Sequence, residues 1–120
     1  MAGTICHFEI PADNPKAAGE FYNKLFGWTV AEGAGDYLLV RTSEQADVLG
    51  GALFKRGEPG RGVTLYVLVE SIEASVEQLE QLGGAVVAPR EAVPGMGWTV
   101  LATDPQGNPI GLFQQDKDAA

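Results

Sequence analysis

The hydrophobic and polar positions of this chain predict a strand, then a helix, then further strands. Residues 4–10 carry the alternation of a strand, and Pro11 ends it. Asn14 followed by Pro15 is a helix-start signal. The Asn14 side chain can accept hydrogen bonds from the free amides of the first turn, and the missing N–H group of Pro15 costs nothing at the first helical position. The helix is expected to run to about Phe26, with Gly27 as its stop. Its apolar stripe, expected to pack on a sheet, consists of Ala18, Phe21, Tyr22 and Leu25.

The same order of patterns returns in the second half of the chain. Strands are expected at 28–32, 36–42 and 47–54, and a polar stretch rich in Gly and Pro follows. The second half then predicts a strand at 63–69, a helix capped by Ser71 that runs to about Leu82, and strands at 85–89, at 98–103 and up to about residue 115. The last five residues are expected to fray.

The two halves align as one supersecondary unit used twice. His7–Gly27 matches Thr64–Gly84 in the order of strand, acidic turn, amphipathic helix and glycine. Such units bury together an apolar face that neither buries alone. We therefore expect a single domain over 1–120, with modules 4–56 and 62–116 joined by a linker at 57–61. The expected fold class is α+β, with two tandem βαβββ modules forming a curved, half-open mixed sheet, or cup, and both helices outside.

Composition narrows the possible partners and compartments. The 120 residues include 16 Asp and Glu against 8 Lys and Arg, a net charge of −8, which repels nucleic acid and anionic lipid. The single cysteine, Cys6, excludes an internal disulfide and a cysteine-rich zinc site. No stretch is long and apolar enough to predict a signal peptide or a membrane span. These features predict a cytoplasmic protein and argue against a nucleic-acid or membrane partner.

Three ordered motifs resemble the vicinal oxygen chelate superfamily, which includes glyoxalase I, bleomycin-resistance proteins and extradiol dioxygenases. They are the run HFEIPADNPKAAGEFYNKLFGW, the LEQLGG that ends the second helix, and the closing DPQGNPIGLF. Metal-dependent members hold a divalent ion with His and Glu on the first and last strands of the two modules. By this resemblance the four positions are His7, Thr64, Ala52 and Gly111.

Only His7 among these positions is a good metal ligand. A shift of one residue to Gly51 or Ile110 supplies no donor either, and the chain has no second histidine. The resemblance therefore implies a degenerate metal site and argues against metal-dependent glyoxalase I activity. No cofactor is expected, although the sequence does not exclude binding of a divalent metal.

His7 and Glu9 are the candidate catalytic pair. Strand alternation places them on one face, and the apolar Phe8 and Ile10 on the other, so the pair is expected to face the concave side of the sheet. A histidine beside a carboxylate can act as a general base. A pair that is only solvated or hydrogen-bonded for structural reasons is the alternative interpretation.

Other residues are candidates for lining a ligand site in the cup. The set combines hydroxyl groups, small residues and aromatic rings: Thr64, Tyr66, Ala52, Gly111, Phe54, Phe113, Trp98 and Tyr37. Each aromatic residue is also explained by core packing, and Trp28 is expected in the core or at a dimer contact. Residues 92–99 have the composition of a mobile flap or of an ordinary hairpin connection.

Three functions remain open from the sequence. The first is metal-independent binding of a small organic ligand in the cup. The second is a lyase or isomerase, related to lactoylglutathione lyase, that uses His7 and Glu9. The third is a dimeric interaction module. The resemblance implies a homodimer under each of them.

Overall fold

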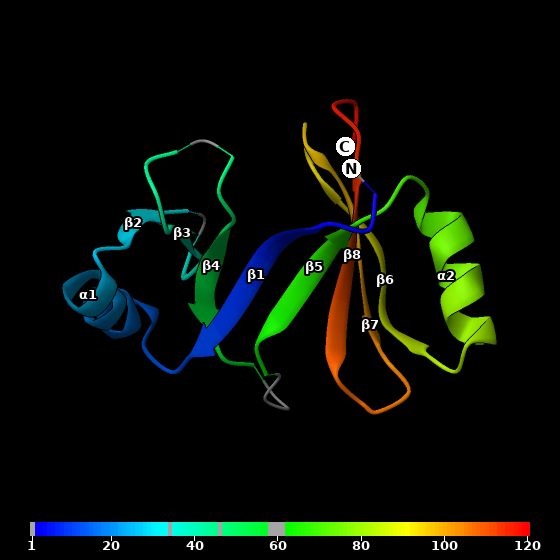
Figure 1. The fold of residues 1–120 in the computed structure, drawn as a ribbon, viewed down its shortest axis with the longest axis horizontal. Helices are drawn as coiled ribbons and strands as arrows, with labels where there is room; N and C mark the ends of the chain where they lie inside the picture. The colour runs from blue at the N-terminus through cyan, green and yellow to red at the C-terminus, as the bar shows by residue number, and fades with distance from the viewer. Residues whose placement is uncertain (1, 34, 46, 58–61) are drawn as a thin grey trace. The chain divides into compact units, whose positions relative to one another are not determined.

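The computed structural model describes residues 2–33, 35–45, 47–57 and 62–120 (Figure 1). They form two compact units. The first unit is Cys6–Thr64, and the second joins Met1–Ile5 to Leu65–Ala120. Most of the linker predicted at 57–61 lies outside the described residues. Within the described ranges, no helix is both long and apolar enough to span a membrane.

The first unit packs one helix against a mixed four-stranded sheet (Figure 1). Its elements are β1 (Ile5–Ala12), α1 (Pro15–Phe26), β2 (Thr29–Glu32), β3 (Leu38–Arg41) and β4 (Gly50–Lys55). The strands lie in the order β2-β3-β4-β1. The pairs β2–β3 and β3–β4 are antiparallel, whereas β1 and β4 are parallel.

The second unit has the same order of elements. They are β5 (Thr64–Leu68), α2 (Ile72–Gln81), β6 (Ala85–Val93), β7 (Gly97–Thr103) and β8 (Pro109–Gln115). Its strands lie in the order β5-β8-β7-β6, again with a parallel pair between the first and last strands of the unit. The α+β class and the βαβββ order predicted for each half are confirmed. A cup that joins the two halves stays a prediction.

Both helices begin and end where the capping signals predict. The Asn14 side chain accepts a hydrogen bond from the amide of Ala17 at 3.0 Å, and the Ser71 hydroxyl accepts from the amide of Ala74 at 3.2 Å. Gly27 ends α1 in the left-handed conformation, with φ 78°, which a residue without Cβ adopts at no steric cost. Local sequence therefore sets the helix boundaries.

The core of the first unit corrects the expected packing of α1. Phe8, Val40 and Leu53 are buried, and Ala18, Tyr22 and Trp28 pack against them. However, Phe21 is 58% exposed and Leu25 is 59% exposed, so the prediction that they pack on the sheet is wrong. The reason is the close approach of the helix to the sheet at Gly19, where a Cβ would lie 3.3 Å from Val30. The buried face of α1 is therefore centred on Gly19, and Phe21 and Leu25 point away from the sheet.

The β6–β7 connection is a tight hairpin in the described structure. β6 extends to Val93, and the amide of Met96 donates to the carbonyl of Val93 at 2.9 Å, so residues 92–99 form a hairpin connection. The C-terminal residues do not fray as predicted, because Ala119 is only 4% exposed and its carbonyl accepts from the Gly95 amide at 2.9 Å. A backbone hydrogen bond and a buried methyl group thus hold the tail on the hairpin.

Candidate functional site

β1 presents its polar side chains on the sheet face away from α1. Phe8 and Ile10 pack in the helix-side core, and the alternation of the strand turns His7 and Glu9 to the opposite face. Glu9 is only 8% exposed, which is unusual for a carboxylate. The two side chains therefore lie on the face that the sequence predicts, and Glu9 needs hydrogen-bond partners.

Tyr37 supplies the group that joins His7 to Glu9. The residue directly precedes β3, and its hydroxyl donates to Glu9 Oε2 at 2.8 Å. The hydroxyl oxygen of Tyr37 also lies 3.0 Å from His7 Nε2, whereas His7 Nε2 and Glu9 Oε2 are 3.7 Å apart. The three side chains thus form one hydrogen-bonded chain, named below the His7–Tyr37–Glu9 chain.

A phenol has one proton, and Tyr37 gives it to the carboxylate of Glu9. The phenol oxygen then accepts a hydrogen bond from His7 in the imidazole tautomer that carries its proton on Nε2. The chain runs from the half-buried imidazole, 30% exposed, to a carboxylate whose side chain is 11% exposed. This arrangement can orient a polar ligand or hold a proton.

Small and apolar residues surround the chain on the same sheet face. Ala52 pairs with Glu9 across the β1–β4 ladder and with Leu39 across the β3–β4 ladder, so all three share this face. Phe54 lies two residues beyond Ala52 on β4 and points the same way. Ala52 is fully buried, whereas Leu39 is 47% exposed. The face therefore combines one polar chain with apolar surface.

Three other candidates meet around β5. Thr64 is fully buried, and its hydroxyl donates to the carbonyl of Gly62 at 3.3 Å. Tyr66 pairs with Gly111, and its ring covers this glycine so closely that a Cβ at 111 would collide with it. The absence of a side chain at Gly111 is thus explained by the ring that lies on it.

Trp98 lies apart from Tyr66, Gly111 and Phe113. It packs against the helix-side core of Ile72, Val100 and Leu112, and its indole N–H donates to Asp116 Oδ2 at 2.9 Å. The guanidinium of Arg90 lies 4.4 Å above its ring. Phe113 pairs with Thr99, so it lies on the other face, and its ring covers Gly97. The structure therefore brings Phe113, but not Trp98, to the face of Tyr66.

The donor set does not make a complete metal site. In the described part of the chain, no three residues among His, Cys, Asp and Glu come together as metal ligands would. At the positions that the resemblance implies, Ala52 and Gly111 have no donor and the Thr64 hydroxyl is already bonded. His7 and Glu9 alone remain, with the Tyr37 hydroxyl between them.

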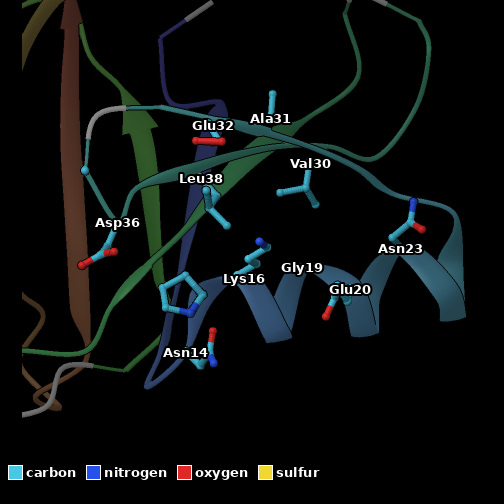
Figure 2. A pocket seen from close by; sticks show the side chains of 12 residues that line it. Asn14, Lys16, Gly19, Glu20, Asn23, Val30, Ala31, Glu32, Asp36 and Leu38 are labelled. Atoms are coloured by element: carbon cyan, nitrogen blue, oxygen red, sulfur yellow. The ribbon is translucent and has the colours of Figure 1, made fainter.

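A separate groove lies on the helix side of the first unit. It has a volume of about 490 Å³ and runs between α1 and the β2–β3 hairpin, as Figure 2 shows. Gly19, Val30 and Leu38 form apolar parts of its lining, and charged side chains such as Lys16 and Glu32 stand around it. None of the three residues of the His7–Tyr37–Glu9 chain lines this groove.

Comparison with known proteins gives relatives for nearly the whole chain. A family model described as a glyoxalase-like domain matches residues 7–113. The Mycobacterium bovis protein CFP32, which carries a provisional glyoxylase name, is 29% identical over 124 residues. That match covers 96% of this chain and 47% of CFP32, so the chain spans about half the length of the curated relatives it matches.

Solved structures share the fold at low sequence identity. A member of the glyoxalase/bleomycin resistance protein/dioxygenase superfamily from Vibrio splendidus 12B01 superposes with a TM-score of 0.70 at 15% identity, over 95% of this chain and 99% of that chain. Methylmalonyl-CoA epimerase from Mycobacterium tuberculosis superposes with a TM-score of 0.68 at 16% identity, over 95% of this chain and 88% of that chain. At such identities the likeness establishes the fold alone.

Proposed function

Because the chain belongs to the glyoxalase-like domain family of the vicinal oxygen chelate superfamily, we propose that it binds a small organic molecule without a resident metal ion. The His7–Tyr37–Glu9 chain is the observation that carries this proposal. It offers hydrogen-bonding groups in fixed orientation at the position where metal-dependent relatives are implied to hold an ion. The resident ligand set is incomplete, so the organic group itself would meet these side chains.

The surroundings of the chain indicate the kind of ligand. Leu39 and Phe54 add apolar surface to the face that carries His7 and Glu9. A molecule with a flat or apolar body and a carbonyl, carboxylate or hydroxyl group at one end would use both parts of this surface. The polar end would meet the half-exposed imidazole of His7, which is the outer member of the chain.

A second candidate is proton transfer on such a ligand, as in a lyase or isomerase. The buried carboxylate of Glu9 next to a histidine and a phenol is the specific observation that favours it. Glu9 would accept a proton from a carbon next to a carbonyl group, and the electron pair would move onto the carbonyl oxygen. His7 would donate a hydrogen bond to that oxygen, because the single proton of the Tyr37 hydroxyl is given to Glu9.

Self-association and a cytoplasmic setting belong to the same proposal. The composition supports the compartment, because one cysteine and a charge of −8 suit a reducing environment without nucleic acid or membrane partners. The resemblance supports a homodimer. A dimeric interaction module without a ligand is the outcome if no small molecule binds.

Ligand screening of metal-free protein tests the proposal directly. Protein treated with EDTA should show a thermal shift with at least one compound from a library of carbonyl- and carboxylate-bearing metabolites. Tyr37→Phe should abolish that shift, whereas Tyr22→Phe, which alters a phenol with no hydrogen bond to a described residue, should keep it. A ligand that binds only after Zn, Ni, Mn or Fe is restored would contradict the metal-independent site.

Isotope exchange separates the enzyme from the binding protein. If Glu9 removes a proton, the identified ligand should take up solvent deuterium at the carbon next to its carbonyl group. Glu9→Gln should stop this exchange, because an amide cannot accept the proton, and His7→Ala should slow it. A ligand that binds tightly but never exchanges leaves binding as the function.

A further inference from the structure

The outer side of α1 carries large apolar residues that the protein does not bury. Phe21 and Leu25 are 58% and 59% exposed, and Ala17 lies one turn before Phe21 on the same side of the helix. These three residues are named here the α1 stripe. Phe26 follows Gly19 by seven residues and lies at the end of the helix on the side of Tyr22 and Trp28. Two large exposed side chains one turn apart form an apolar patch, and such patches mark interaction sites.

The Phe21 ring of the stripe and the neighbouring Phe26 ring are already held in place. The Phe21 ring meets Tyr22 edge to face at 5.2 Å between centroids, and the Phe26 ring stacks on Tyr22 at 6.3 Å. Tyr22 stacks in turn on Trp28 of the core at 5.0 Å. Binding at the stripe would therefore order few side chains, which is the property of anchor residues in interfaces.

The charges on α1 select the partner. The helix carries two of the eight basic residues, Lys16 and Lys24, and one of the sixteen acidic residues, Glu20. Most of the surface of a chain with net charge −8 repels a second copy, whereas this helix does not. Glu20 and Lys24 form no ion pair with any residue that the structure describes, so both are available to a partner.

We propose that the α1 stripe is the surface on which a second copy of this chain packs, with the two α1 helices antiparallel about a two-fold axis. Such an axis places Phe21 of one copy beside Leu25 of the other, and the reverse. Glu20 and Lys24 lie one turn apart on one side of the stripe, so each Glu20 meets Lys24 of the second copy. A parallel arrangement would bring Glu20 against Glu20 and would align the two helix dipoles.

The buried area fits a weak, reversible pair. A large apolar side chain buries about 150–250 Å² when covered, so the exposed parts of Phe21 and Leu25 offer roughly 200 Å² per copy. A standard interface buries about 800 Å² per partner. The stripe would thus form the apolar centre, and polar residues around it would supply the rest.

This inference deepens the self-association included in the proposed function by naming its surface, and it is independent of the ligand site. Sedimentation equilibrium of the full chain should show a concentration-dependent dimer. Phe21→Glu and Leu25→Glu should each weaken it at least tenfold while the far-ultraviolet circular dichroism stays unchanged. Met96→Glu is the matched control, because Met96 is 63% exposed in the second unit and should leave dimerisation intact.

Charge exchange tests the antiparallel arrangement. At an ionic strength of about 0.15 M, where the net charge is screened beyond roughly 8 Å, Glu20→Lys alone and Lys24→Glu alone should each weaken the dimer, because like charges then meet across the axis. The double variant should restore it, and a mixture of the two single variants should form a heterodimer that neither forms alone. A monomeric wild type would overturn both the surface and the self-association, whereas a dimer insensitive to Phe21→Glu would overturn the surface alone. A double variant as weak as the singles would overturn the antiparallel pairing.

Discussion

Tyr37 joins a buried carboxylate to an imidazole through one hydroxyl group. Glu9 Oε2 accepts the phenol proton at 2.8 Å, and the phenol oxygen lies 3.0 Å from His7 Nε2. Without this hydroxyl, the imidazole and the carboxylate oxygen would face each other across 3.7 Å, which is too long for a hydrogen bond. The stability of the first unit and the properties of the site therefore depend on the same atom.

Tyr37→Phe is expected to destabilise the protein by about 1–3 kcal/mol, because it removes one hydrogen bond to a buried carboxylate. Urea unfolding followed by circular dichroism measures the change. Tyr22→Phe is the matched control and should change the free energy of unfolding by less than about 0.5 kcal/mol. Equal effects of the two variants would show that the hydroxyl of Tyr37 contributes nothing to folding.

Trp98 acts at the same scale on a different carboxyl group. Its indole N–H holds the pKa of Asp116 below the ordinary aspartate value, with a smaller contribution from the amide of Asp118. A lowered pKa stabilises the fold at every pH above the ordinary value, and the contribution is lost as the pH falls through the lowered pKa. The stabilising effect of this hydrogen bond is therefore expected at neutral pH and absent in strong acid.

Trp98→Phe should raise the pKa of Asp116 towards the ordinary value. Carbon-detected titration of the Asp116 carboxyl group measures this change in the folded protein. Asp104 is the internal control, because hydrogen bonds from Asn108 lower its pKa independently of Trp98. If both carboxyl groups shift equally in the variant, the effect is global and the indole is not its cause.

At the scale of elements, two glycines allow the parallel strand pairs to carry aromatic residues. The Phe8 ring lies over Gly51 between β1 and β4, and the Tyr66 ring lies over Gly111 between β5 and β8. A side chain at either glycine would displace the ring or separate the strands. The small residue and the aromatic residue on the neighbouring strand therefore form one packing unit.

Gly111→Ala should destabilise the protein by about 1–3 kcal/mol through this overpacking. The effect should shrink in a Tyr66→Ala background, where the ring is absent, and a double-mutant cycle measures the difference. Gly62→Ala is the control, because a Cβ at Gly62 meets no atom within 4 Å. An effect of Gly111→Ala that is the same with and without the Tyr66 ring would show that the ring is not its cause.

Features that depend on neighbouring residues could be predicted from the sequence, and those that depend on distant contacts could not. The caps at Asn14 and Ser71 and the shared face of His7 and Glu9 follow from local geometry. The outward turn of Phe21 depends on how closely Gly19 approaches Val30. Similarly, the bridging role of Tyr37, which lies 28 residues beyond Glu9, depends on the pairing of β3 with β4, the strand that lies between β3 and β1.

Strand alternation does not tell which side chains of a strand point to the helix side of the sheet and which point to the opposite side. Trp98 and Thr99 must point to opposite sides, but the period of two does not say which of them meets α2. The tertiary packing decides it, because Trp98 packs against the helix-side core of Ile72, Val100 and Leu112. The contact of the C-terminal residues with the β6–β7 hairpin could not be predicted from local sequence either, because Ala119 and Gly95 lie more than twenty residues apart in the chain.

At the scale of the whole molecule, the charge of −8 governs how copies meet. Two copies repel through all their charges, whereas the proposed pairing gains only two exposed ion pairs, each worth about 1 kcal/mol or less. Net repulsion therefore outweighs the local attraction between Glu20 and Lys24. Screening should accordingly favour association, in contrast to an interface held together by ion pairs.

Dimerisation should strengthen as ionic strength rises from about 0.01 M to about 0.15 M, where the Debye length falls from roughly 30 Å to roughly 8 Å. Sedimentation equilibrium at the two salt concentrations measures the dissociation constant. Lys117→Gln, a surface change outside α1 that adds one negative charge to the net, should weaken the dimer slightly at low salt and not at high salt. A dimer that dissociates on addition of salt would contradict this balance.

The path of the chain between its two units has a consequence for dividing the protein. The Gly3 amide donates to the Leu68 carbonyl at 2.7 Å, and the Leu68 amide donates to the Thr4 carbonyl at 2.8 Å, so residues at the start of the chain complete the second unit. From Cys6 to Thr64 the chain builds the first unit and then returns. A break in the stretch 58–61 therefore does not divide the molecule into its units. The two pieces of such a split gene are expected to need each other to fold, as in a complementation pair.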